Sequence, residues 1–151
     1  MKLDSRLSSV LHVLLHLAEK DARATSEVLS RHLGTNPVVV RRTMASLREA
    51  GIVTSGRGQG GGWTLSRPLE RITLRDVYDA LGAPTIFAFG NRNETPVCLI
   101  EQAVNREIAG AMREAEDLLL TRFSEITLAD LDRDFRARWA AQSKDRDHGP
   151  L

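Results

Sequence analysis

Two adjacent arginines, Arg41 and Arg42, are the side chains whose type and position point most directly to chemistry. They follow Asn36 and Pro37, which suit the N-cap and the first position of a helix, where proline loses no hydrogen bond. About one turn into such a helix, guanidinium groups can reach guanine edges or phosphates of DNA. The spacing therefore predicts a DNA-binding helix that begins at Asn36, Pro37 and Val38.

The glycine-rich segment 56–62, GRGQGGG, is a second candidate contact surface. It lacks the Gly-Lys-Ser/Thr ending of nucleotide-binding loops, and strand-like residues rather than a helix follow it. At the tip of a hairpin, Gly60 and Gly61 would let the backbone approach DNA, while Arg57 and Gln59 could enter a minor groove or contact phosphates. The alternative is a flexible hairpin turn that makes no contact.

The remaining reactive side chains form no catalytic set. His12 and His16 are four residues apart and could face one metal ion, but no third ligand is evident, so packing or surface polarity explains them better. No Ser-His-acid arrangement is visible, so the sequence predicts neither an enzyme nor a metal site. The single cysteine, Cys98, opens a predicted helix, where a thiolate is stabilised; it is either a reactive thiol or a small inert hydrophobe.

Composition and charge agree with a polyanion-binding module that carries a separate arm. The 151 residues, 42% hydrophobic and 27% charged, suit one globular domain, or one domain plus an arm. Residues 1–67 hold ten basic and five acidic side chains, whereas residues 68–151 hold eleven and fifteen. No apolar run approaches the roughly 20 residues of a membrane span, so a cytoplasmic protein without a membrane partner is expected. Chance variation in surface charge is the alternative.

The elements around the arginines assemble into a winged helix. An amphipathic pattern predicts a helix over residues 7–18, and capping signals predict a short helix over 26–33 and a third over 37–50. Strand-like residues at 52–55 and 63–66 flank the glycine-rich segment. A helix-turn-helix followed by a hairpin gives a fold that is mainly α with a small β-hairpin wing. The candidate DNA contacts are Thr25, Ser26, Asn36, Pro37, Val38, Arg41, Arg42, Arg57, Gln59, Gly60 and Gly61.

The second half of the chain predicts an arm for self-association. We expect the DNA-binding domain over residues 1–82, a loop over 83–96, a dimerisation helix and a C-terminal helix over 97–142, and a disordered tail over 143–151. The long helix, from Val97 to about Phe123, has more apolar surface than one small domain can cover, so pairing with a second copy is predicted. Its apolar stripe comprises Ile100, Val104, Ile108, Ala111, Ala115, Leu119 and Phe123.

Three motifs resemble those of the Rrf2 family of bacterial regulators. They are NPVVVRR at 36–42, GRGQGGGW at 56–63 and ITLRDVY at 72–78, and the resemblance extends over about residues 1–137. It implies a homodimeric winged-helix transcription factor, usually a repressor, whose paired recognition helices and wings read a palindromic operator in double-stranded DNA. By position, Val38, Arg41 and Arg42 match recognition-helix contacts, and Arg57 matches the arginine of the wing.

The sequence departs from the family pattern at the residues that hold a cofactor. Some members bind an iron–sulfur cluster through three closely spaced cysteines, and only Cys98 resembles one of these positions. The chain is therefore similar to a cluster-free subgroup without a cofactor, in which Cys98 is a thiol sensor or an inert residue. A competing input is a small apolar ligand near Ile86, Phe87 and Phe89. A competing function is a winged-helix module that docks a protein partner and binds DNA weakly or not at all.

Overall fold

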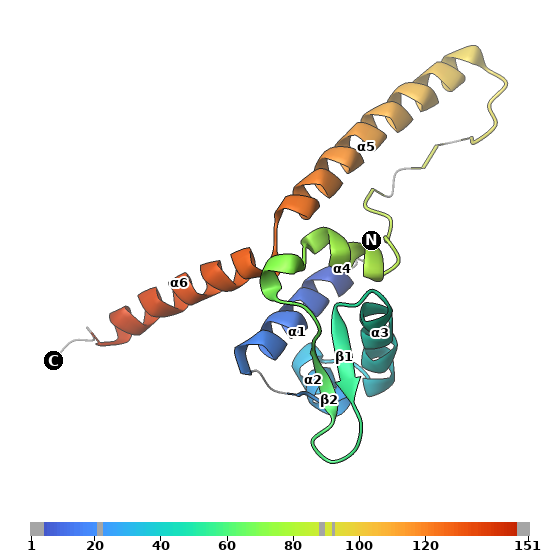
Figure 1. Ribbon diagram of the computed structural model, residues 1–151. Helices are drawn as coiled ribbons and strands as arrows, with labels where there is room; N and C mark the ends of the chain where they lie inside the picture. The colour runs from blue at the N-terminus through green and yellow to red at the C-terminus, as the bar shows by residue number, and fades with distance from the viewer. Residues whose placement is uncertain (1–4, 21–22, 88–89, 92, 148–151) are drawn as a thin grey trace.

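The computed structural model describes residues 5–20, 23–87, 90–91 and 93–147, and it confirms a mainly helical fold with one two-stranded antiparallel hairpin (Figure 1). The elements in chain order are α1 (Arg6–Lys20), α2 (Ser26–Leu33), α3 (Pro37–Glu49), β1 (Val53–Gly56), β2 (Gly62–Leu65), the 3-10 helix η1 (Leu69–Arg71), α4 (Leu74–Ala80), α5 (Leu99–Glu125) and α6 (Leu128–Asp147). The hairpin follows α2 and α3 directly, as in a winged helix.

Capping residues define the helix-turn-helix. The Thr25 hydroxyl accepts a hydrogen bond from the backbone N–H of Val28 at 3.3 Å and so begins α2. Gly34 ends α2 in the left-handed conformation, with φ of 60°. The Asn36 side chain then accepts from the N–H of Val38 at 2.8 Å and begins α3. These caps hold the turn between the two helices to the length that the sequence predicted.

The core of the winged domain lies between α1, α3 and the hairpin. Its fully buried side chains come from five separate elements or their flanks, so no helix of this domain is independent of the others. The side chains that are less than 2% exposed are Leu14, Met44, Leu47, Ile52, Ile72, Leu128, Val53 and Val77. Leu128 belongs to α6, so the start of that C-terminal helix is anchored in the same core.

A third backbone segment joins the hairpin. β1 and β2 pair from Val53↔Leu65 to Gly56↔Gly62. On the other side of β2, Ala24 exchanges two backbone hydrogen bonds with Trp63, of 3.2 and 2.9 Å. A Cβ atom on Gly62, where φ is 146°, would lie 3.0 Å from the Ala24 backbone, so only glycine suits this approach. The base of the wing is thereby fixed to the start of α2.

Two capping motifs connect the arm to the winged domain. The backbone N–H of Thr73 donates to Asp76 Oδ2, and that of Thr127 donates to Asp130 Oδ2, both at 2.9 Å. The two threonines are themselves paired across a short antiparallel bridge. Because this bridge lies between the end of α5 and the start of α6, it fixes where both long helices leave the domain (Figure 1).

The predicted bounds of α1, of the end of α3 and of both strands differ from the structure by one or two residues. Two further differences lie in the arm. The long helix α5 begins at Leu99 rather than Val97, because Cys98 is the extended residue that precedes its first turn. Residues 143–147, expected from the sequence to belong to a disordered tail, continue α6; residues 148–151 lie outside the described residues. Ion pairs between Asp132 and Arg136 and between Asp134 and Arg138, four residues apart, support this polar helix. Among the described residues, no helix is both long and apolar enough to cross a membrane.

Candidate nucleic-acid interface

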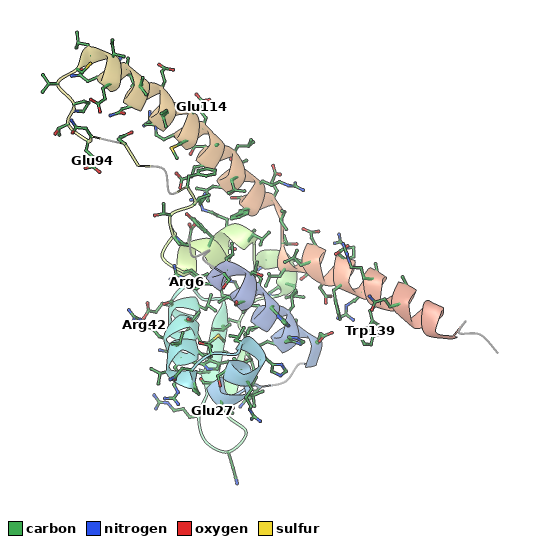
Figure 2. The ribbon with its side chains drawn as sticks, turned by 180° about the vertical axis from the view of Figure 1, so that it is seen from behind. Arg6, Glu27, Arg42, Glu94, Glu114 and Trp139 are labelled. Carbon is green, nitrogen blue, oxygen red and sulfur yellow. The ribbon has the colours of Figure 1, made fainter. Side chains whose placement is uncertain are left out.

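The exposed side of α3 carries the predicted arginines. Arg41 and Arg42 are both exposed, and Val38, one turn earlier, is 64% exposed (Figure 2 labels Arg42 on the outer surface). The opposite side of the helix buries Val40 and Met44 in the core. This amphipathic arrangement leaves the arginines and a short apolar side chain available to a partner, which is how a recognition helix presents itself to the major groove.

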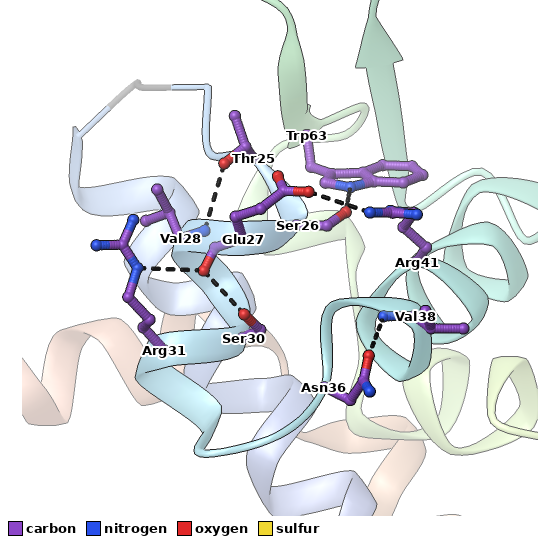
Figure 3. A network of polar contacts seen from close by, with 10 residues as sticks. All are labelled: Thr25, Ser26, Glu27, Val28, Ser30, Arg31, Asn36, Val38, Arg41 and Trp63. Carbon is purple, nitrogen blue, oxygen red and sulfur yellow. Dashed lines mark hydrogen bonds and ion pairs between the residues drawn. The ribbon is translucent and has the colours of Figure 1, made fainter.

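Arg41 is held by a residue of the preceding helix. Its Nη2 atom lies 3.1 Å from Glu27 Oε1, and both side chains are 58% exposed (Figure 3). The pKa of Glu27 is lowered, first by its own backbone N–H in the first turn of α2 and then by Arg41. The carboxylate therefore remains ionised at neutral pH. Sequence analysis missed this pair because the two residues are fourteen positions apart.

The tip of the wing is open to solvent. Arg57, Gln59 and Gly60 are exposed, whereas Gly61 is half-buried and donates its N–H to Gly58 O at 3.0 Å. Arg23, which the sequence did not single out, donates from Nη1 to Gly60 O at 3.3 Å. The wing tip therefore presents Arg57 and Gln59, and Arg23, from the segment before α2, contacts its glycine backbone. Arg23 carries no capping or periodicity signal in the sequence. Its hydrogen bond to Gly60 joins residues 37 positions apart and so depends on the tertiary fold.

Trp63 belongs to the core rather than to the contact surface. Its side chain is 8% exposed, and its indole N–H donates to Ser26 Oγ at 3.0 Å (Figure 3). The guanidinium carbon of Arg48 lies 5.9 Å from the ring centroid. Ser26 is 7% exposed, so its predicted role as a direct DNA contact does not fit; it links α2 to the hairpin. Thr25 is exposed, but its hydroxyl serves as the cap of α2.

The predicted dimerisation stripe of α5 divides into two parts. Ile100, Val104 and Ile108 are 76%, 50% and 47% exposed, and Ala111 and Ala115 are also exposed. Nearer the winged domain, Leu119 and Phe123 are half-buried, and the Phe123 ring lies edge-on to Tyr78 with centroids 6.0 Å apart. The first part is therefore available to a second molecule, whereas the last turns attach α5 to α4.

One residue of the loop before α5 lines a groove with that helix. Phe87 and four residues of α5 form this apolar groove, and Ile86, the residue before Phe87, is half-buried. The α5 residues are Ile108, Ala111, Met112 and Ala115. Phe89, the third residue of the apolar cluster in the sequence, lies outside the described residues.

Cys98 is exposed and lies at the start of α5. The backbone N–H groups of Glu101 and Ile100 lower the pKa of its thiol, in that order of effect.

His12 and His16 lie with their Nε2 atoms 2.7 Å apart, and the His16 and His32 rings are stacked. Among the described residues, no three His, Cys, Asp or Glu side chains are grouped closely enough to hold a metal ion.

A family model matches most of this chain. Residues 3–134 match Rrf2, described as an iron-dependent transcriptional regulator. The chain belongs to the Rrf2 family. It is thus a winged helix-turn-helix transcriptional regulator and not an enzyme, as its sequence predicted.

Two Bacillus subtilis proteins illustrate the similarity in sequence. The "Putative HTH-type transcriptional regulator YwnA" is 31% identical over 124 residues, which are 80% of this chain and 92% of that protein. A second regulator of the same description, YwgB, is 40% identical over 83 residues, which are 54% of this chain and 53% of that protein. The alignment with YwgB thus spans about half of either chain.

Solved structures share the fold. A Lactobacillus plantarum protein described as a "putative transcriptional regulator" has a TM-score of 0.75 at 24% identity, covering 97% of this chain and 100% of that one. CymR, the global cysteine regulator of B. subtilis, has a TM-score of 0.60 at 22% identity, covering 88% and 97%. At these identities the likeness concerns the fold alone.

The family is described as iron-dependent, but this chain has a single thiol to offer as a ligand. An iron–sulfur cluster held by one subunit needs several thiolates, and Cys98 is the only cysteine in the sequence. Its thiol is exposed at the end of the arm and has no His, Cys, Asp and Glu cluster around it among the described residues. These residues do not fit a three-thiolate cluster.

Proposed function

We propose that this Rrf2 regulator is a homodimeric, sequence-specific repressor that acts on DNA in the cytoplasm. The observation that carries the proposal is the exposed arginine pair, Arg41 and Arg42, on a capped α3, together with an exposed arginine of the wing, Arg57. A helix with this face enters a major groove, where arginine can donate two hydrogen bonds to guanine. The wing then lies over the adjacent backbone or minor groove.

The dimer is proposed from the free end of α5. Ile100, Val104 and Ile108 are each at least 47% exposed in the single chain, although all are large and apolar. Pairing with the same helix of a second copy would remove this surface from water. Two winged domains related by a two-fold axis would then meet a palindromic operator, whose half-sites are about 34 Å apart per helical turn.

Cys98 is the proposed point of signal input, through oxidation by a peroxide. Its exposed thiolate attacks one peroxide oxygen, so that a sulfenic acid forms and hydroxide leaves. Because Cys98 lies beside the proposed dimer contact at Ile100, the modification would change how the two copies of α5 meet. Cys98→Ser protein should then bind DNA equally with and without peroxide. A small apolar ligand in the groove at Phe87 is the competing input.

The first test is selection of duplexes from a random DNA library with the reduced, metal-free protein. The enriched duplex and a scrambled one are then compared by fluorescence anisotropy at two salt concentrations. We expect selective binding that weakens steeply with salt, because phosphate contacts release counterions. Arg41→Glu and Arg42→Glu should each weaken binding at least about fivefold, whereas Arg113→Glu on α5 should not. Absence of enrichment would overturn the proposal and favour the protein-docking module.

A further inference from the structure

The ion pair between Glu27 and Arg41 bridges the two helices of the helix-turn-helix on their exposed side (Figure 3). Exposed pairs of this kind add little to folding stability, because solvent screens them and ordering two long side chains costs entropy. The Glu27–Arg41 pair nevertheless differs from an ordinary surface ion pair in its position. One partner, Arg41, is proposed to read DNA, and the other, Glu27, is an acid that contacts it. The pair therefore bears on binding more than on folding.

Glu27 is an acid in an otherwise basic surface. Between Asp21 and Glu49 the chain contains five arginines and no other acidic residue. Its carboxylate remains ionised at neutral pH, as its lowered pKa requires. A negative charge at this position is repelled by DNA phosphates, so it opposes the sequence-independent part of binding.

Arg41 has two ways to use its charge on DNA. A guanidinium that moves freely contacts any phosphate, which adds affinity without selectivity. A guanidinium that is held at one Nη atom keeps its other N–H donors in a fixed plane. Such a group gains most from guanine, which presents O6 and N7 together in the major groove. The contact with Glu27 favours the second use.

We infer that Glu27 is a specificity-determining residue, which withholds Arg41 from the phosphate backbone and orients it for a base with two acceptors. This inference rests on the proposed function, because it takes Arg41 to be a DNA-reading side chain. Glu27 itself is a positioning residue and need not touch DNA.

The test compares Glu27→Gln with wild type on the selected and the scrambled duplexes. The amide is nearly the same size as the carboxylate but carries no charge. We expect affinity for the scrambled duplex to rise and the slope of log affinity against log salt to steepen by about 0.9, the effect of one added phosphate contact. The ratio of selected to scrambled affinity should fall at least about fivefold, as when one oriented arginine–base contact is lost.

Two further variants separate orientation from simple charge removal. Glu49→Gln removes the same charge from the last residue of α3, two turns beyond Arg41, and should leave the affinity ratio at the wild-type value. In an Arg41→Gln background, Glu27→Gln should no longer change the ratio, because the residue on which it acts is absent.

The outcomes of these binding measurements separate failure of the Glu27 inference from failure of the proposed function. An unchanged ratio in Glu27→Gln, an equal fall in Glu49→Gln, or a persisting effect in the Arg41→Gln background would overturn the inference. Wild-type protein that fails to distinguish the two duplexes would instead overturn the proposed function. Far-ultraviolet circular dichroism confirms that each variant is folded before its affinities are compared.

Discussion

At the residue scale, the side chains of the interface divide into those that face outward and those that hold the surface in place. Arg42 and Arg57 are exposed. Ser26 and Trp63 belong to the same stretch of sequence, but their side chains are buried and hydrogen-bonded to each other. Residue type alone could not separate these groups, because serine and tryptophan both occur as DNA contacts and as internal links. The separation depends on a hydrogen bond between residues 37 positions apart.

Ser26→Ala tests this assignment through stability. The variant leaves the buried indole N–H of Trp63 without its acceptor, which should lower the free energy of unfolding by about 1–3 kcal/mol. Urea denaturation followed by tryptophan fluorescence measures the loss. Ser55→Ala, at an exposed position of β1, is the matched control and should change stability little. A Ser26→Ala protein of wild-type stability but reduced DNA affinity would restore Ser26 as a direct contact.

At the element scale, local signals predicted the helices, but long-range pairs determine how they are joined. The bounds of α2 and the start of α3 agreed with prediction because Thr25, Gly34 and Asn36 act on their own neighbours. The Ala24 bridge to the hairpin could not be predicted, because it joins separate segments. The same applies to the bridge between Thr73 and Thr127, which joins residues 54 positions apart.

Thr127→Ala tests the connection between α6 and the winged domain. It removes the hydroxyl that accepts from the Asp130 N–H, and should lower the free energy of unfolding by about 1 kcal/mol at neutral pH. The Thr127 N–H and hydroxyl lower the pKa of Asp130 below its ordinary 3.8, so the carboxylate stabilises the fold above that pH. That contribution is lost as the pH falls through the folded-state pKa. The difference in Tm between variant and wild type should therefore become smaller in acid. A Tm difference that does not change with pH would contradict the role of Asp130.

The start of α5 makes a separate prediction about the Cys98 thiol. Because two backbone N–H groups lower its pKa, a larger fraction is thiolate at neutral pH than in a free cysteine. Alkylation by iodoacetamide should thus reach half its maximal rate at a lower pH in the folded protein than in the urea-unfolded chain. The unfolded chain is a suitable control, since it holds the same cysteine without the helix. Identical profiles would show that the helix does not activate the thiol.

At the scale of the whole molecule, the basic winged domain and the acidic arm differ in charge and in the tasks that we propose for them. The sequence predicted this division from charge and from the apolar stripe of α5. It could not predict that Leu119 and Phe123 are half-buried by the chain's own α4 region, because the stripe is continuous along the helix. The exposed part of the stripe lies at the end of α5 remote from the winged domain, so in the proposed dimer small changes there would alter the spacing of the two DNA-binding domains.

Val104→Asp tests whether that end of α5 forms the dimer. Val104 is 50% exposed, so a charge there should leave the fold intact yet oppose pairing of two apolar helices. Sedimentation equilibrium should show a monomer, and affinity for a palindromic duplex should fall about 100-fold, because the two half-sites no longer bind as one unit. Arg113→Asp is the matched control: Arg113 is exposed on the same helix, about 180° around its axis from Val104, so this variant should remain dimeric. Dissociation by Arg113→Asp together with a dimeric Val104→Asp would place the contact on another side of α5, and wild-type monomers would remove the two-fold arrangement on which operator recognition was proposed.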